Sequence, residues 1–219
     1  TQLSLIGQII SKLTALKSAA EDLDTNGVLA AKSSSENTAF TAAPGSSTVA
    51  GRYAVQVLAL AKAAKFQSAA FASADTVAAG TFTLTVPDHD PYSVVIPDGT
   101  SLEDAAFLIR QSGAPVSAVV LNDGTNRYLS VTARDTGYPT TGVAADALGI
   151  TFTPTGTSTN KLPALTQVQA AVNASVKVDN ITFSRRTNTI SDAIPGTTLT
   201  LKKEGGAAED LVVSTDADG

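Results

Sequence analysis

The sequence predicts an α+β fold in which strands dominate, with one amphipathic helix at the N-terminus. Three observations lead to this prediction. Apolar residues near the N-terminus recur in alternating steps of three and four. Several later segments alternate apolar with smaller or polar residues, as half-buried strands do, and one stretch places a short capped helix between two pairs of strands.

The N-terminal segment is predicted to form one helix with a heptad stripe that ends near Asn26, because Asn26-Gly27 accepts the left-handed conformation that closes helices. A heptad seam needs a facing helix, and no comparable run occurs elsewhere in the sequence. The candidate interface with a helical partner consists of Ile6, Ile9, Leu13, Leu16 and Leu23, with Ala20 completing the stripe.

The partner helix is expected outside these residues, in a missing C-terminal part of the same chain or in another subunit. The alternative is that the helix lies on the β-rich part of this chain. The sequence contains no Met and begins at Thr1 within the helical pattern, which we interpret as an excised internal fragment.

A connector rich in Ser, Thr, Ala and Gly follows over 33–48, with a short strand near Phe40 and a turn at Pro44-Gly45. Residues 51–60 alternate as a half-buried strand. Residues 59–74 are rich in Ala and fit neither pattern clearly.

A β-β-α-β-β unit is predicted over about 80–135. Residues 81–96 form a hairpin, and Thr100 with Glu103 forms a capping box for a helix over 102–112, which ends at Gly113. Strands over 116–121 and 128–133 flank Asp123-Gly124, a strong hairpin signal. Further along, a small helix is expected over 165–171 and strands over 175–183 and 197–202.

Composition and charge argue against several classes of function. The chain carries 15 Lys and Arg against 20 Asp and Glu, a formal charge of −5, so we expect no nucleic-acid partner. It has no run of about 18 apolar residues, so no membrane-spanning segment is expected. Cys is absent and His89 is the single histidine, which leaves little for thiol, histidine-base or multi-histidine metal chemistry.

The remaining constellations are predicted to be turns. Asp88-His89-Asp90 lies between Pro87 and Pro91, and adjacent residues rarely converge on one metal ion. Residues 122–126 offer oxygen ligands but lack the spacing and distal Glu of a calcium loop. We therefore predict no catalytic, cofactor-binding or metal-binding residues, no cofactor, and no enzymatic activity.

Three stretches carry a family resemblance. Residues 51–66 join a strand to an Ala-rich run, residues 101–137 contain Leu-Glu-Asp-Ala-Ala-Phe-Leu-Ile-Arg, and residues 174–201 contain Arg-Arg-Thr-Asn and Ile-Pro-Gly. In this order they resemble the flagellar filament cap proteins, also called hook-associated protein 2. The middle stretch is similar to the hook IN motif of flagellar axial proteins, with Ile109-Arg110 in place of the usual Ile-Asn. Asp179-Asn180 replaces the family's common Asp-Gly.

The resemblance implies an organisation: a leg helix and connector over 1–35, a first β-rich head over 36–69 plus 166–219, and a second head over 70–165 inserted into the first. In the family, the N- and C-terminal helices pair in the leg. The resemblance also implies a secreted, extracellular structural protein that forms an oligomeric cap at the filament tip, retains exported flagellin and promotes its folding and insertion. The implied partners are further copies of the chain, flagellin and other hook-associated proteins.

Two alternatives remain open. Another flagellar axial protein, such as a hook-filament junction protein or the outer domain of a flagellin, can share the hook IN motif. A β-rich surface adhesin that binds host mucin or glycans is the other, and this activity could coexist with capping.

Overall fold

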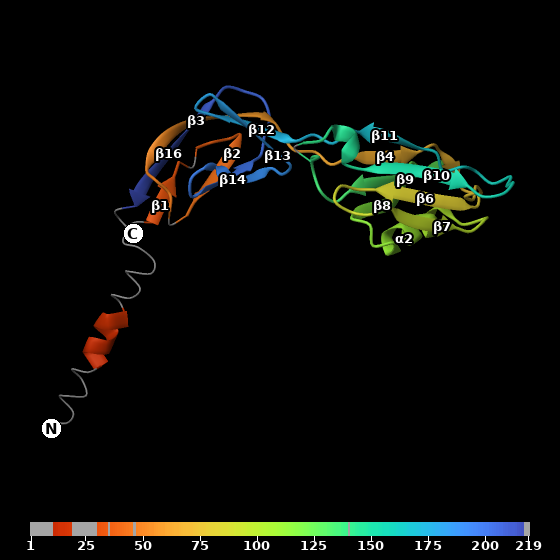
Figure 1. The fold of residues 1–219 in the computed structure, drawn as a ribbon, viewed down its shortest axis with the longest axis horizontal. Coiled ribbons are helices and arrows are strands. Elements are labelled where there is room, and N and C mark those ends of the chain that lie inside the picture. Colours follow the sequence, from red (N-terminus) through yellow and green to blue (C-terminus); the bar gives the residue numbers. More distant parts are fainter. Residues whose placement is uncertain (1–10, 19–29, 35, 46, 140, 217–219) are drawn as a thin grey trace. The chain divides into compact units, whose positions relative to one another are not determined.

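The computed structural model describes residues 11–18, 30–34, 36–45, 47–139 and 141–216 (Figure 1). Within these ranges strands dominate, which confirms the predicted mostly β fold. The chain divides into two compact units. The first comprises residues 1–56, 177–181 and 189–219, and the second comprises residues 57–176 and 182–188.

Two sheets contribute residues to the first unit. One sheet has the order β14-β15-β2 and contains Thr189–Ile194, Thr197–Leu201 and Phe40–Pro44. The other has the order β1-β16-β3-β12-β13 and contains Ala30–Ser33, Glu209–Asp216, Gly51–Ala59, Ala174–Val178 and Ile181–Arg185. Alternate side chains of these strands, among them Phe40, Leu199 and Leu211, are fully buried, because successive residues of a strand point to opposite faces.

The second unit contains a three-stranded sheet and a five-stranded sheet. The order β10-β6-β7 contains Gly149–Pro154, Gly80–Thr85 and Tyr92–Ile96. The order β11-β4-β9-β5 contains Leu165–Gln169, Lys65–Ser68, Asn126–Ala133 and Phe71–Ala72, and β8 (Val116–Asn122) also pairs with β9. Helix α2 (Leu102–Gln111) lies beside β8 in Figure 1, and a short 3-10 helix covers Ala144–Asp146.

The core of the second unit is built by the period-two and period-3.6 patterns of the sequence. Phe82 and Leu84 point inward from β6, and Leu102 and Ile109 point inward from α2; all four side chains are buried. The ring of Phe82 lies 4.8 Å from that of Phe152 between centroids, and the rings are tilted, a favourable geometry for an aromatic pair.

Helix α2 begins at Leu102, as predicted, but its N-cap is one residue later than the predicted Thr100, so the predicted capping box of Thr100 with Glu103 is wrong. The N-cap is Ser101, whose side chain accepts a hydrogen bond from the backbone N–H of Asp104. Thr100 instead donates its hydroxyl to the carbonyl oxygen of Pro97 at 2.6 Å, so it closes the preceding turn. Gly113 has a φ of 80°, which confirms the glycine stop after the helix.

Other local predictions have mixed outcomes. The hairpin of β6 and β7 and the hairpin of β8 and β9 are confirmed, as are the strands at 51–60 and 197–202. The small helix expected over 165–171 is wrong, because β11 occupies Leu165–Gln169 and pairs antiparallel with β4. The predicted helix end near Asn26 lies outside the described residues.

Candidate functional site

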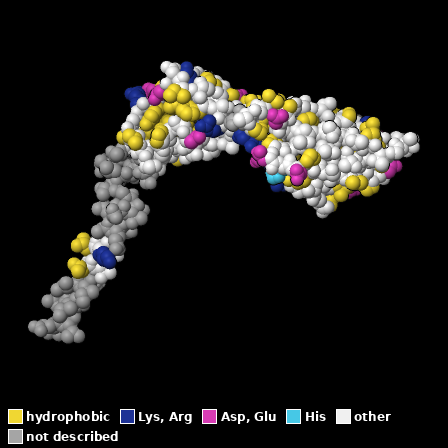
Figure 2. Space-filling view, in the orientation of Figure 1, with side chains coloured by type: hydrophobic (Ala, Val, Ile, Leu, Met, Phe, Trp, Pro, Cys, Tyr) yellow, Lys and Arg dark blue, Asp and Glu magenta, His cyan; other side chains and the backbone are white. Residues whose placement is uncertain are grey.

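The predicted helix interface is partly described. Leu13 and Leu16 lie in a helical segment over residues 11–18. Ile6, Ile9 and Leu23 lie outside the described residues. The exposed fractions of Leu13 and Leu16 are 66% and 67%, and residues three apart share a helix face. Figure 2 shows hydrophobic side chains gathered on this segment, so the described part of the stripe presents an apolar face to solvent.

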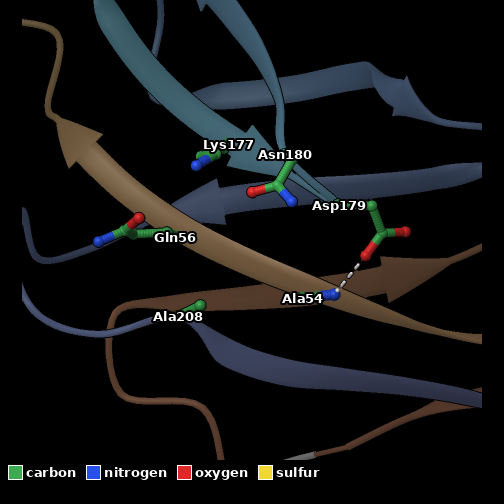
Figure 3. A pocket seen from close by; sticks show the side chains of 6 residues that line it. All are labelled: Ala54, Gln56, Lys177, Asp179, Asn180 and Ala208. Atoms are coloured by element: carbon green, nitrogen blue, oxygen red, sulfur yellow. Dashed lines mark hydrogen bonds between the residues drawn. The ribbon is translucent and has the colours of Figure 1, made fainter.

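A polar hollow lies in the first unit and opens to solvent, with a volume of about 260 Å³ (Figure 3). Strand β3, strand β12 and the turn after β12 supply most of its wall. Its lining residues are Ala54, Gln56, Lys177, Asp179, Asn180 and Ala208.

The turn in this wall is held in a left-handed backbone conformation. Asp179 and Asn180 have φ angles of 45° and 71°, which suits the two-residue turn that joins β12 to β13. The carboxylate of Asp179 accepts a hydrogen bond from the Ala54 N–H at 2.9 Å, and the backbone N–H of Asp179 donates to the Ala54 carbonyl at 3.0 Å. Both bonds fasten the turn to β3.

The hollow supplies hydrogen-bonding and charged groups. The amide of Gln56 donates to the Gly206 carbonyl at 2.8 Å, and Lys177 adds an ammonium group to the wall. The six lining residues include no histidine, serine, threonine or cysteine. Sequence reasoning missed this hollow, because its walls come from distant segments; the Asp179-Asn180 turn was its one visible signal.

A second open hollow, of about 440 Å³, lies in the second unit. Its lining residues are Arg134, Asp135, Thr136, Arg186 and Thr187. The guanidinium of Arg186 lies 3.6 Å from the carboxylate of Asp88, and the hydroxyl of Thr136 donates to the Arg186 carbonyl at 2.7 Å. This wall mixes both signs of charge.

The two constellations that could suggest metal binding are turns. His89 lies in the turn between β6 and β7, where its Nδ1 is 3.3 Å from the Tyr92 hydroxyl. The carboxylate of Asp123 accepts hydrogen bonds from Asn126 N–H at 2.7 Å and Thr125 N–H at 2.9 Å, and from the Tyr128 hydroxyl at 3.0 Å. These bonds hold the pKa of Asp123 below its usual value, led by the bond from Asn126.

Searches of the described ranges add two findings. No group of three or more His, Cys, Asp or Glu side chains there is placed to hold a metal ion. The helices in those ranges include none with the length and apolar character needed to cross a membrane.

Two family models match the ends of the chain. Residues 1–64 match the model described as flagellar hook-associated protein 2 N-terminus, and residues 171–219 match the model described as flagellar hook-associated protein 2 C-terminus.

Curated relatives carry the same description. The chain is 29% identical over 239 residues to the B-type flagellar hook-associated protein 2 of Pseudomonas aeruginosa, an alignment that covers 100% of this chain and 50% of that protein. It is 32% identical over 203 residues to flagellar hook-associated protein 2 of Escherichia coli K12, covering 87% of this chain and 43% of the relative. The chain thus spans about half the length of these relatives.

Solved structures share the fold. The D1-D2-D3 domains of the flagellar cap protein FliD from Escherichia coli match with a TM-score of 0.77 and 26% identity, covering 99% of this chain and 64% of that one. The D2-D3 domains of the same protein match with a TM-score of 0.70 and 25% identity, covering 85% of this chain and all of that one.

Proposed function

Because the chain belongs to the flagellar hook-associated protein 2 family, we propose that the protein of which it is part caps the tip of the bacterial flagellar filament. The match of both ends of the chain to models of one family carries this proposal. The cap would be an oligomer that retains exported flagellin, promotes its folding and directs its insertion below.

The N-terminal helix is proposed to be a leg of this cap. Leu13 and Leu16 expose an apolar pair, and burying two leucine side chains against a facing helix would stabilise the contact by about 3–6 kcal/mol. Ile6, Ile9 and Leu23 would continue the same seam. Its partner would be a helix of the C-terminal part of the protein or of another copy.

The β-rich remainder is proposed to form the plate of the cap. The proposed boundaries are 1–35 for the leg and connector, 36–69 with 166–219 for the first head, and 70–165 for an inserted second head.

The proposed partners follow from this role. They are further copies of the protein, flagellin and other hook-associated proteins, and the proposed location is outside the cell at the filament tip.

Deletion of the gene in its source organism tests the proposal. We expect cells without filaments in electron micrographs, with monomeric flagellin accumulating in the medium. If the gene encoded a flagellin, its deletion would instead leave no flagellin in the medium. Normal filaments in the deletion strain would overturn the cap proposal and favour an adhesin.

A further inference from the structure

Strand β8 leaves one edge unpaired in the described part of the chain. Its ladder partner is β9, in antiparallel register from Val116 opposite Ala133 to Asn122 opposite Arg127. Arg134 N–H donates to Pro115 O, and Asp123 N–H donates to Asn126 O. The backbone N–H and C=O groups of the odd-numbered residues of β8 therefore point toward β9. Because the direction of these groups alternates along a strand, those of the even-numbered residues point toward the outer edge.

The residues of strand β8 itself lack the features that usually protect a sheet edge from pairing. The strand reads Val-Ser-Ala-Val-Val-Leu-Asn, with no charged residue and no proline, and its register with β9 has no bulge. Val119 and Leu121 are 44% and 43% exposed and point away from the core that buries Val116 and Ala118. An uncharged edge flanked by exposed apolar side chains is suited to pairing with another strand.

One side chain, that of Arg110, is hydrogen-bonded to the outer edge of β8. The guanidinium of Arg110, from the last turn of α2, donates to the Ala118 carbonyl at 2.5 Å and lies 5.9 Å from the ring centroid of Phe107. The Arg110 guanidinium occupies the Ala118 carbonyl oxygen, which would otherwise accept a hydrogen bond from an incoming strand.

We propose that the β8 edge pairs antiparallel with β8 of a second copy of the chain, and that Arg110 limits this pairing. A two-fold register centred on Val119 places Ala118 opposite Val120 of the second copy, so residues that both face the edge exchange hydrogen bonds.

The second copy is favoured because the strand is complementary to itself. In this register Val119 meets Val119 and Ser117 meets Leu121, all on the exposed face. Because the strand carries no charge, no like charges face each other across the pair. The inference goes beyond the proposed capping role, since it concerns a surface of the second unit and holds whichever helix covers Leu13 and Leu16.

Cysteine cross-linking of the 219-residue chain tests the register, because the chain has no cysteine of its own. In the proposed pair the Cα atoms of Val119 lie about 4.5 Å apart, within disulfide range. Val119→Cys is expected to form a covalent dimer under mild oxidation. Ser117→Cys is the matched control: its two copies would lie about 14 Å apart and should not cross-link. Adding Leu121→Cys to Ser117→Cys should restore the cross-link.

Sedimentation equilibrium of variants without cysteine tests the role of Arg110. Arg110→Ala is expected to tighten dimerisation about tenfold, since a charge-assisted hydrogen bond no longer competes. Val119→Lys should abolish dimerisation, because it places like charges opposite each other. The proposal is overturned if Val119→Cys fails to cross-link or cross-links no better than Ser117→Cys, or if Arg110→Ala associates no more tightly than the unaltered chain.

Discussion

Arg127 joins three segments of the second unit. Its Nη1 donates to both carboxylate oxygens of Glu103 at 3.0 and 2.9 Å, and its Nη2 donates to the carbonyls of Ala72 and Ser73 at 3.1 and 2.7 Å. The side chain is 18% exposed, so these bonds are less screened than those of a surface pair. Strand β9, the start of α2 and the turn after β5 thus share one guanidinium.

We predict that Arg127→Ala lowers the free energy of unfolding of the second unit by about 2 kcal/mol, between the values for exposed and buried ion pairs. Urea unfolding followed by tyrosine fluorescence measures it, since Tyr92, Tyr128 and Tyr138 lie in this unit. Arg134→Ala removes an exposed arginine from the same unit and should change stability by less than about 0.5 kcal/mol. Equal effects of the two substitutions would contradict the role given to Arg127.

Asp98 links three segments and gives the second unit an acid-sensitive bond. Its carboxylate accepts hydrogen bonds from the Ser158 hydroxyl at 2.6 Å, the Asn160 amide at 3.0 Å and the Ala79 N–H at 3.1 Å. These bonds, led by that from Ser158, lower the pKa of Asp98 from its ordinary value of 3.8. The charged form is therefore stabilised by folding.

A lowered pKa stabilises the fold above about pH 4, and this stabilisation is lost as the pH falls through the folded-state pKa. We predict that Asp98→Asn destabilises the second unit near neutral pH and flattens the decline of its stability under acid conditions. Urea titrations at several pH values measure both effects. Ser158→Ala, which removes one donor, should act in the same direction but less. A slope unchanged by Asp98→Asn would refute this account.

At the scale of residues, turns and helix ends could be predicted from the sequence, but the contacts of individual side chains could not. The glycine stop at Gly113 and the turn at Asp123-Gly124 were predictable, because only local backbone geometry decides them. Thr100 and Ser101 are both competent caps, and the choice between them depends on whether Thr100 also closes the turn at Pro97. The hollow beside Lys177 was beyond reach, since tertiary structure brings its walls together.

The β12–β13 turn shows how an element depends on two residues. Asn180 has a φ of 71°, where residues other than Gly, Asn and Asp are strained by about 1–2 kcal/mol. We predict that Asn180→Ala lowers the stability of the first unit by about 1 kcal/mol, and that Asn180→Gly changes it by less than about 0.5 kcal/mol.

Amide hydrogen exchange measures this prediction locally. Val55 and Leu211 are buried residues of the first unit, and their protection should fall about fivefold in Asn180→Ala. Protection that falls equally in Asn180→Gly would mean that the asparagine side chain, rather than the left-handed backbone, matters here.

Elements with strong local patterns were predictable, and those fixed by distant partners were not. Strand β6 alternates clearly and was identified from the sequence. The sequence predicts a helix over 165–171, where strand β11 forms. Pairing with β4, which includes a register shift between Gln167 and Gln169, decides the conformation of this segment. Strand β16 was missed, and it pairs with β1 and β3 from near the start of the chain.

At the scale of the whole molecule, the fold class and the family could be predicted from the sequence, while the assembly remains a proposal. The heptad stripe predicted a helix with an unfilled partner surface, and Leu13 and Leu16 are exposed on the helical segment that the structure describes. The partner itself could not be predicted, since a heptad stripe indicates that a helix packs against it but not which chain supplies that helix.

We predict that Leu13→Asp and Leu16→Asp together disrupt assembly of the full-length protein while leaving both β-rich units folded. Both side chains are exposed in this chain, so their loss removes no core contact. A charge in a helix-to-helix seam must instead be desolvated. Circular dichroism checks the fold and light scattering checks the assembly. Ser11→Asp, a change at an exposed position outside the stripe, is the control.

Rescue of the deletion strain with purified full-length protein tests the central claim most directly. Filaments are counted in electron micrographs after addition of the unaltered protein or of the Leu13→Asp, Leu16→Asp double variant. We predict that the unaltered protein restores filaments and that the double variant does not. Failure of the unaltered protein would contradict the cap function, and equal rescue by the double variant would contradict the leg helix.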